Sequence, residues 1–371
     1  MKQKVCHITS VHPLEDIRIF KKECVSLANN GFDVTLIGCG ENAFETIKEN
    51  VRLVSLNIPV KNRFQRILKR ANGVYKKAIE IDADIYHLHD PELILYGKYL
   101  KKKGKKVIFD SHEDVPAQIL SKKWIPSPFR KVFSLLYALF EKITLNKFDA
   151  LVSVTPTLSD KLRKINPNTF QITNYPFLDE AVLSINPSLD NSIVFAGGIT
   201  SQWLHKEIIQ AIDRTNNVTY NLAGGADKKY LEELKLLSGW SKVNFVGKIP
   251  FVQVNSFVCQ SSVGMALCDY SPNVGGKTGS LGNTKLFEYM MAGIPVICTD
   301  FVLWKEIVEK NNCGICVNPH DIHQISRAII ELINNKDKSR EMGLNGRKLV
   351  VEKYNWTTQE KILLKMYNKI K

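Results

Sequence analysis

A glycine-rich stretch followed by a lysine and a glutamate carries the clearest potential for binding chemistry. Residues 275–284 read GGKTGSLGNT, and Lys285 and Glu288 follow directly. The segment 284–292 is expected to be a helix, because it has a helical pattern and precedes the predicted strand Pro295–Cys298. Backbone N–H groups at a helix start suit a diphosphate, to which Lys285 would add positive charge. Glu288 could accept hydrogen bonds from ribose hydroxyls; alternatively, the loop is solvated and Glu288 only stabilises the helix start.

A second polar group follows the predicted strand Lys106–Asp110. The residues Asp-Ser-His-Glu-Asp occupy 110–114, so His112 and Glu113 should lie at the carboxyl end of that strand. A histidine there could hydrogen-bond a sugar or a reacting acceptor, whereas the plainer interpretation is a polar loop or a helix cap. Further polar candidates near the same edge are Asp16, Arg18, His89 and Asp90. Histidines at strand ends are often structural, and that alternative stays open.

The elements that must position these residues alternate between short apolar runs and helical patterns. The predicted strands of the first half are Val5–Thr9, Asp33–Ile37, Ile85–Leu88, Lys106–Asp110 and Ala150–Val154, with a helix over Ile17–Asn29. Those of the second half are Ile193–Ala196, Thr219–Leu222, Val243–Val246, Val263–Leu267, Pro295–Cys298 and Gly314–Val317, with helices over 204–213, 228–237, 284–292 and 321–334. Such alternation predicts an α/β protein with parallel sheets covered on both faces.

The 371 residues are enough for two such domains. The Pro- and Asn-bearing stretch Asn174–Asn191 is the expected boundary, and the last segment, 339–371, is expected to be a long helical tail. We therefore expect a first domain over 1–180, a second over 190–350, and a closing helix over 351–371 that crosses back to the first domain.

Several of these motifs together resemble a known family. The segment GNTKLFEYMMAGIPVI, which ends at Ile297, resembles the donor-binding signature of GT-B glycosyltransferases of the GT4-like family. Val194–Ile199, Asn221–Gly225 and Asn244–Pro250 resemble strands and turns of the family's C-terminal domain, and Thr9–Arg18 resembles the entry loop of its acceptor domain. The resemblance implies two doubly wound, Rossmann-like domains that face each other across a cleft.

The resemblance also assigns roles to individual residues. It implies that Glu288 holds the donor ribose and that glycine turns let the backbone approach the phosphates. The donor-binding residues expected on this basis are Gly197, Gly198, Lys206, Gly224, Lys248, Asn283, Thr284, Lys285 and Glu288. The arginine that customarily precedes the position of Lys206 is absent, and an earlier glutamate that many members carry is Ser280 here.

In the first domain, the resemblance implies that His112, with Glu113 close by, is the catalytic candidate near the transferred sugar. Asp16, Arg18, His89 and Asp90 would lie on the acceptor side. The implied reaction moves a sugar from a nucleotide-sugar to a lipid-linked or cell-surface glycan, with retention and without metal or cofactor. Such transferases serve polysaccharide, capsule or lipopolysaccharide synthesis.

The charge suggests a second partner. There are 51 Lys and Arg against 37 Asp and Glu, a net charge of +14, and most of the excess lies within residues 1–180. Residues 121–147 mix Lys122, Lys123, Arg130 and Lys131 with Trp124 and several Phe and Leu side chains, which suits an anionic membrane surface. A solvated face over ordinary core contacts is the alternative. A nucleic-acid partner is not expected, because no recognised motif accompanies the charge.

Other features of the sequence restrict the location of the protein and the class to which it belongs. No apolar run approaches the roughly 18–20 residues of a membrane span, and no signal-peptide pattern opens the chain. With eight scattered cysteines expected as free thiols, this favours a cytoplasmic protein, peripheral at most to the inner face of the membrane. Asp82-Ala83-Asp84 has a metal-binding form but precedes a strand, so a turn is expected and no metal site is assigned. A nucleotide-sugar epimerase of the same fold, or a basic nucleic-acid-binding protein, are the alternatives.

Overall fold

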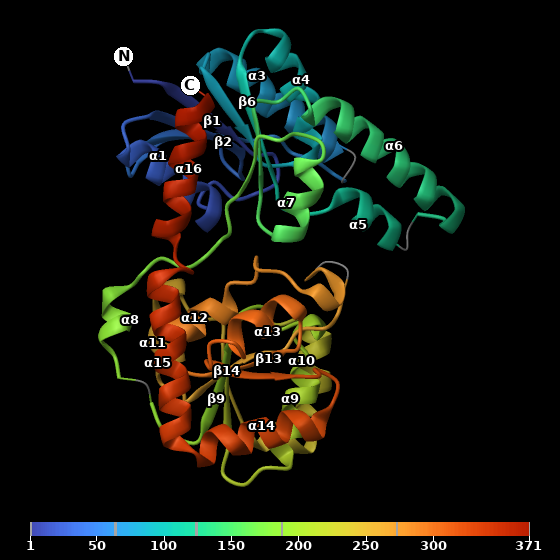
Figure 1. Cartoon of the computed structure of the whole chain (residues 1–371). Coiled ribbons are helices and arrows are strands. Elements are labelled where there is room, and N and C mark those ends of the chain that lie inside the picture. Colours follow the sequence, from blue (N-terminus) through green and yellow to red (C-terminus); the bar gives the residue numbers. More distant parts are fainter. Residues whose placement is uncertain (1, 63–64, 123–124, 187, 272–273, 371) are drawn as a thin grey trace. The chain divides into compact units, whose positions relative to one another are not determined.

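The chain forms two compact units (Figure 1). The computed structural model describes residues 2–62, 65–122, 125–186, 188–271 and 274–370. Unit 1 comprises Met1–Asn174 together with Thr358–Lys371, and unit 2 comprises Tyr175–Thr357. The chain therefore enters unit 2 at the start of the stretch Asn174–Asn191.

Unit 1 is built on an eight-stranded sheet with the order β3-β4-β2-β1-β5-β6-β7-β8. All neighbouring strands are parallel except β3, which pairs antiparallel with β4. The strands are β1 (Lys4–Ile8), β2 (Asp33–Cys39), β3 (Phe44–Lys48), β4 (Val51–Leu56), β5 (Ile85–Leu88), β6 (Lys106–Ser111), β7 (Ala150–Ser153) and β8 (Thr169–Gln171). Sequence reasoning did not predict β3, β4 or β8. For two of these strands the reason is plain, since β3 is an exposed edge strand and β8 is very short.

Helices cover both faces of this sheet. They are η1 (Ile17–Cys24, a π-helical segment), α1 (Val25–Asn29), η2 (Arg66–Arg70), α3 (Ala71–Ile81), η3 (Pro91–Leu93), α4 (Ile94–Lys102), α5 (Val115–Ser121), α6 (Ser127–Leu145), α7 (Pro156–Arg163) and α16 (Trp356–Ile370). Cys6 and Ile8 of β1 join the apolar core that includes Val74 of α3. Because side chains alternate along a strand, His7 points to the opposite face, where its ring contacts Tyr367 of α16.

Unit 2 contains a six-stranded sheet with the order β11-β10-β9-β12-β13-β14, all parallel. The strands are β9 (Ser192–Ala196), β10 (Thr219–Ala223), β11 (Val243–Gly247), β12 (Val263–Ala266), β13 (Val296–Thr299) and β14 (Gly314–Val317). The helices are α8 (Glu180–Ser184), η4 (Ser201–Trp203), α9 (His205–Asp213), α10 (Lys228–Lys235), η5 (Ser238–Lys242), α11 (Phe251–Cys259), η7 (Gly276–Thr278), α12 (Lys285–Met291), α13 (Val302–Val308), α14 (Ile322–Asn334) and α15 (Lys336–Glu352). The strand order reverses between β9 and β12, the point at which doubly wound sheets bind ligands. The prediction of doubly wound α/β units is confirmed.

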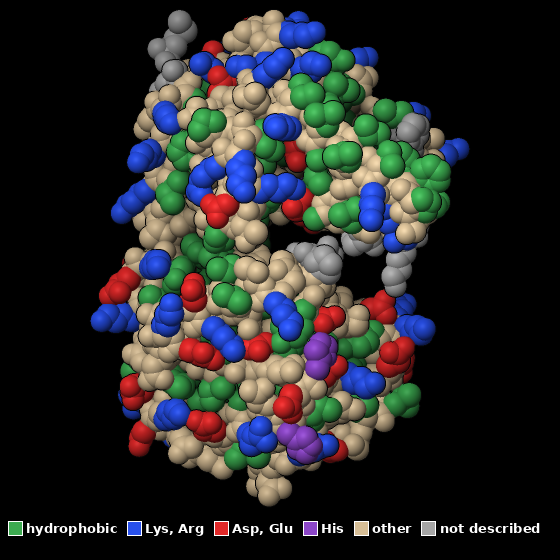
Figure 2. Space-filling view, turned by 45° about the vertical axis from the view of Figure 1, so that its right-hand side comes forward, with side chains coloured by type: hydrophobic (Ala, Val, Ile, Leu, Met, Phe, Trp, Pro, Cys, Tyr) green, Lys and Arg blue, Asp and Glu red, His purple; other side chains and the backbone are tan. Residues whose placement is uncertain are grey.

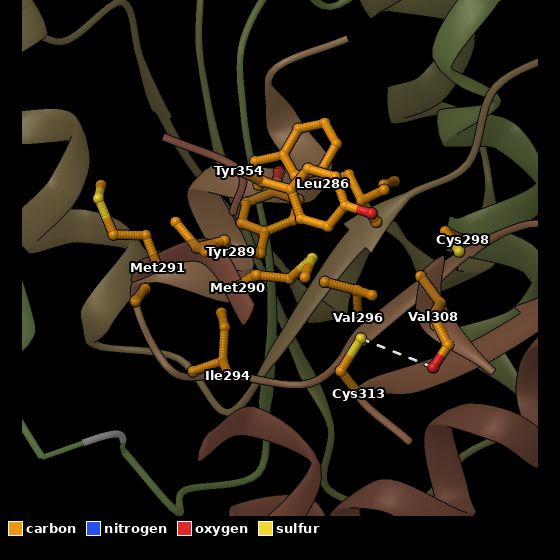
Figure 3. Close-up of a cluster of buried hydrophobic side chains, with 14 of the residues drawn as sticks. Leu286, Tyr289, Met290, Met291, Ile294, Val296, Cys298, Val308, Cys313 and Tyr354 are labelled. Atoms are coloured by element: carbon orange, nitrogen blue, oxygen red, sulfur yellow. Dashed lines mark hydrogen bonds between the residues drawn. The ribbon is translucent and has the colours of Figure 1, made fainter. Parts of the chain in front are cut away.

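The helix α12 is fixed by its packing against this sheet (Figure 3). Leu286, Tyr289 and Met290 are fully buried in one apolar cluster that also contains Val296 of β13. A Cβ atom at Gly264 of β12 would lie 2.3 Å from the Tyr289 ring, so the helix sits directly on the sheet. The polar residues of α12 therefore have a rigid support.

The end of the chain differs from the expected single helical tail. Two helices, α15 and α16, replace it, and they are separated by residues 353–355. The Asn355 side chain donates hydrogen bonds to the carbonyl oxygens of Val350 and Val351, which end α15. The Trp356 amide then donates to the Pro176 carbonyl oxygen at 2.7 Å. These contacts turn the chain before α16 begins.

The remaining general expectations concern membranes and thiols. Among the described residues, no helix combines the length and apolar character that a membrane crossing requires. All eight cysteines are free thiols, and seven of them are buried. Asp82 ends α3 in a left-handed conformation, and Asp84 accepts a hydrogen bond from the Lys4 amide. Residues 82–84 therefore form the expected turn before β5.

The long helix α6 has an unusual distribution of side chains. Polar Ser134 and Glu141 lie on its buried side, where the Ser134 hydroxyl donates to the Pro116 carbonyl oxygen at 2.9 Å. The exposed large apolar side chains of this helix are Phe129, Val132, Phe133, Leu135, Leu136, Leu139 and Ile143. Burial raises the pKa of Glu141 to about 7, since nearby Lys161 offsets that effect only in part and Asp114 adds to it.

Because the pKa of Glu141 is raised, we predict that the free energy of unfolding depends on pH. A carboxyl group whose folded pKa is raised stabilises the fold below its unfolded pKa of about 4.3, and the contribution is lost as the pH rises toward 7. Glu141→Gln keeps the neutral form, so the variant should exceed the wild type in free energy of unfolding by on the order of 2 kcal/mol at about pH 8, and by much less at about pH 5. Urea unfolding at both pH values measures this difference. The control is Glu80→Gln, a change at an exposed glutamate of α3. An equal difference at both pH values would contradict the assignment.

Candidate functional site

The loops after β9, β10 and β11 lie against one another at one edge of the unit 2 sheet. The Gly197 amide donates to the Ala223 carbonyl oxygen at 2.9 Å, and the Gly224 amide donates to the Gly247 carbonyl oxygen at 2.7 Å. Gly224 has φ +148°, and a Cβ atom there would lie 1.6 Å from the Gly197 carbonyl oxygen. Only glycine fits at position 224, so Gly224 is structurally required at this edge.

Two side chains of α12 reach the same edge. Lys285 Nζ donates to Glu288 Oε2 at 3.1 Å, and the two side chains are 18% and 21% exposed. A Cβ atom at Gly197 would lie 2.7 Å from Lys285 Cε, so the lysine passes directly over the β9 loop. The structure thus brings together four predicted residues, and the lysine–glutamate pair is accessible to a ligand.

The remaining predicted donor residues surround this group less closely. The Asn283 side chain accepts a hydrogen bond from the Lys285 amide at 3.1 Å, and the Thr284 carbonyl oxygen accepts one from the Glu288 amide at 2.9 Å. Both residues therefore organise the first turn of α12. Gly198, Lys206 on α9 and Lys248 after β11 are exposed. Their part in binding stays a prediction.

The glycine-rich loop before α12 is anchored through its backbone. Gly275, Gly276 and Gly279 have positive φ angles, and a Cβ atom at Gly279 would lie 2.5 Å from Phe301 Cβ. The Trp304 indole donates to the Ser280 carbonyl oxygen at 2.8 Å, while the Ser280 hydroxyl accepts from the Gly282 amide. Ser280 therefore helps to hold the loop, through both its carbonyl oxygen and its hydroxyl.

Sequence reasoning missed a polar group beyond the ends of β12 and β13. The Tyr270 hydroxyl contacts Asp300 Oδ1, and His320 Nε2 lies 3.0 Å from Asp269 Oδ1. Burial and the Asp300 contact raise the pKa of Tyr270. Only the position of these residues just after predicted strands could have pointed to them.

Unit 1 has its own polar centre around Asp110, at the end of β6. Arg18 donates to Asp110 Oδ2 through Nε and Nη2, at 3.0 and 2.9 Å, and its Nη1 donates to the Ile172 carbonyl oxygen. Both side chains are buried. Burial alone would raise the pKa of Asp110, but Arg18 and the neighbouring His112 hold it well below its usual range. This ion pair connects η1, β6 and the chain after β8.

His112 is the accessible member of this centre. Its Nε2 lies 3.3 Å from Asp110 Oδ2, and its side chain is 22% exposed. The ring of His12, from the loop after β1, lies 5.1 Å away. Glu113 is exposed, and its carboxylate accepts a hydrogen bond from Gln118. His112 could therefore meet a ligand directly, whereas Glu113, which precedes α5, is paired with Gln118 of that helix.

The predicted acceptor-side residues mostly support the loops. Asp90 is buried and accepts hydrogen bonds from the Thr9 hydroxyl at 2.9 Å and the Ser10 amide at 2.6 Å, so it joins the loops after β5 and β1. Asp16 caps η1 by accepting from the Arg18 and Ile19 amides. Arg18 and Asp90 are buried, so any effect on an acceptor is indirect.

His89 lies deeper, within a cluster that sequence reasoning missed. It adjoins His7, His87 and Glu23, all buried, and its Nδ1 lies 3.6 Å from Asp110 Oδ2. Burial lowers the pKa of each of these histidines and raises the pKa of Glu23 well above its usual range. The available signal was a histidine inside each of two otherwise apolar strands, β1 and β5.

Two family models match the chain, Glycosyltransferase Family 4 over residues 22–172 and Glycosyl transferases group 1 over residues 184–349. A curated relative is an uncharacterized glycosyltransferase of Methanocaldococcus jannaschii, which is 26% identical over 143 residues, 38% of this chain and 34% of that protein. The chain thus matches about a third of the length of this relative.

Solved structures resemble the whole chain. Sucrose-phosphate synthase from Thermosynechococcus elongatus aligns over 100% of this chain and 99% of its own, with a TM-score of 0.76 and 16% identity. Anabaena HepE in complex with UDP and glucose aligns over 99% of both chains, with a TM-score of 0.71 and 13% identity. These likenesses establish the fold, and the family models establish the relationship: the chain belongs to the GT4-like glycosyltransferases with the GT-B fold.

Proposed function

We propose that this protein moves a sugar from a nucleotide-sugar donor to a lipid-linked or cell-surface glycan acceptor. The observation that carries this proposal is the Lys285–Glu288 pair beside Gly197, at the edge where the strands of unit 2 end. Doubly wound sheets bind nucleotides at this edge. Anabaena HepE, which shares the fold, has been solved with UDP and glucose, and this supports a nucleotide-sugar as the donor.

The donor contacts follow from the chemistry of the pair. Lys285 would turn from Glu288 toward the diphosphate, and Glu288 would then accept hydrogen bonds from the ribose hydroxyls. The amides of Gly197 and Gly224 are already bonded within the loops, so the exposed backbone of Gly198 would be the part that meets the phosphates. Lys206 and Lys248, both exposed, would add positive charge.

The transfer needs few further groups. The bond from the anomeric carbon to the phosphate oxygen breaks, a bond to the acceptor oxygen forms, and the acceptor proton passes to the departing phosphate. Lys285 and backbone N–H groups would stabilise the charge that develops on this leaving group. We propose retention of the anomeric configuration, with neither a metal ion nor a cofactor assigned to this step.

In unit 1, His112 is the proposed contact for the transferred sugar or the acceptor. Its ring is held by Asp110, whose position is fixed by Arg18, so its free edge is oriented before a ligand arrives. Glu113 and Asp16, which are more exposed than Asp110, are the proposed polar groups around it.

The proposed location is the inner face of the cell membrane. The outer side of α6 exposes Leu135 and Leu139, and Lys131 lies on the same helix. Figure 2 shows one face of unit 1, on which apolar and basic side chains are interspersed. Such a mixture suits an anionic lipid surface carrying the acceptor. Of the basic residues noted in the sequence, Lys123 lies outside the described residues, as does Trp124.

Glu288→Ala should weaken nucleotide binding. The variant loses charge-assisted hydrogen bonds to ribose, each worth about 1.5–3 kcal/mol, so Kd should rise about 10- to 100-fold. Thermal-shift titration with nucleoside diphosphates and nucleotide-sugars measures this, and the change of an exposed glutamate of α13, Glu306→Ala, is the control. If no nucleotide stabilises the wild type, or if both variants bind equally well, the donor site is wrongly assigned.

His112→Ala should slow transfer and leave nucleotide binding intact. Losing one hydrogen bond that strengthens in the transition state predicts a fall in kcat of about 10- to 100-fold. Release of nucleoside diphosphate in the presence of acceptor lipids reports turnover, with His323→Ala, an exposed histidine in unit 2, as the control. Unchanged kcat would remove His112 from the mechanism. Conversion of the donor sugar without any acceptor would instead indicate an epimerase.

Changes on α6 and in the basic sequence segment before it should weaken membrane binding. Leu135→Ser with Leu139→Ser removes exposed apolar area, and reversing Lys122, Lys123, Arg130 and Lys131 removes attraction worth about 1 kcal/mol per charge. Each set should reduce binding to phosphatidylglycerol vesicles at least about 10-fold. Sedimentation with vesicles measures this, and reversal of Lys228 and Lys229 on α10 is the control. Unaltered binding in both sets would refute the membrane surface.

A further inference from the structure

Four ligand-type side chains of unit 1 converge in its interior, on the buried side of Asp110. His7 of β1 and His87 of β5 are direct register partners in the sheet. His89 follows β5 immediately, and Glu23 comes from η1, which covers this face of the sheet. All four are buried, so three segments of the chain meet through them.

Their distances approach those of a small coordination shell. His7 Nδ1 lies 2.9 Å from His89 Nε2, and Glu23 Oε2 lies 3.9 Å from His87 Nδ1 and 4.0 Å from His89 Nε2. One ligand atom from each residue lies within 4.8 Å of all the others. In a tetrahedral zinc site with bonds of about 2.0–2.2 Å, ligand atoms lie about 3.3–3.6 Å apart. The ligand atoms now lie between 2.9 Å and at most 4.8 Å apart, so separations would have to change by up to about 1 Å to complete such a site.

Glu23 lacks the partners that a buried carboxylate requires. Neither of its oxygens accepts a hydrogen bond, and the nearest cation is Arg18 Nη2, 3.3 Å from Oε1. That guanidinium already donates twice to Asp110. Two buried carboxylates therefore share one arginine, which leaves one negative charge without a counter-ion in a low-dielectric interior.

The surrounding groups are suited to orient metal-binding histidines. Asp110 Oδ2 lies 3.6 Å from Nδ1 of His89, the ring nitrogen that faces away from the cluster. The Tyr367 hydroxyl lies 3.1 Å from Nε2 of His7, the nitrogen opposite the Nδ1 that meets His89. Histidines that bind a metal commonly give their other N–H to a carboxylate or another oxygen in this way.

We propose that His7, Glu23, His87 and His89 bind one divalent transition-metal ion, with Zn²⁺ the best match to three imidazoles and one carboxylate. The ion would be structural, because the four ligands are buried and leave no open position for a substrate. It would tie η1 to β1 and β5, and so support Asp110 beneath His112. This proposal is independent of the transferase reaction, and its tests need no activity.

The alternative arrangement contains a proton in place of the metal. A protonated Glu23 would be neutral and could donate a hydrogen bond within the cluster, whose histidines would also be neutral. The two arrangements predict opposite results for Glu23→Gln, since glutamine imitates a protonated glutamate but is a poor metal ligand.

The first experiment measures metal content in the full, untagged chain. After incubation with Zn²⁺ and removal of free ion, elemental analysis should find about one equivalent in the wild type and less than about 0.2 in Glu23→Gln. Glu141→Gln, another buried carboxylate of the same unit, is the matched control and should keep about one equivalent. Wild type without bound metal, or equal content in Glu23→Gln, would overturn the proposal.

A second experiment stays decisive if Glu23→Gln fails to fold. Wild type stripped with a chelator should melt at least about 5 °C lower than the zinc-loaded protein and recover on addition of Zn²⁺. Loading with Co²⁺ should give the strong visible absorption of a four-coordinate ion, without the charge-transfer band of a thiolate ligand. An unchanged Tm, or a thiolate band that shows cysteine ligation, would overturn the proposal.

Discussion

The buried ion pair between Arg18 and Asp110 is the interaction on which the organisation of unit 1 depends. One guanidinium joins the segment after β1, the end of β6 and, through the Ile172 carbonyl oxygen, the chain after β8. Asp110 in turn positions His112 on its accessible side and faces His89 on its buried side. Loss of either partner would leave a buried charge uncompensated, so the loops around His112 depend on a pair that no ligand contacts directly.

In unit 2 the strand-end loops are held together by a backbone contact, where unit 1 uses an ion pair. The contact between Gly224 and the Gly197 carbonyl oxygen brings two strand-end loops together, and the apolar face of α12 fixes Lys285 and Glu288 over them. The fully buried Tyr289 and Met290 explain why so short a helix holds its polar residues in place. A rigid apolar support below an accessible charged pair is the arrangement that nucleotide binding needs.

The sequence predicted most of the parallel strands and helix α12, because buried parallel strands are continuous apolar runs with little ambiguity. It did not predict β3, whose residues are exposed, or the break before α16, which depends on the contacts of Asn355 and Trp356. His112 and Glu288 could be proposed from their positions after predicted elements. The cluster around Glu23 could not, because its members come from three segments whose register and burial emerge only in the folded sheet.

The proposed function requires that Lys285 and Glu288 hold a nucleotide-sugar. A crystal structure of the protein with a nucleoside diphosphate bound would test this requirement. We expect ribose hydroxyls within hydrogen-bond distance of Glu288, with Lys285 turned from Glu288 to the diphosphate beside the Gly197 turn. A nucleotide bound elsewhere, with the Lys285–Glu288 pair of 3.1 Å still intact, would contradict it.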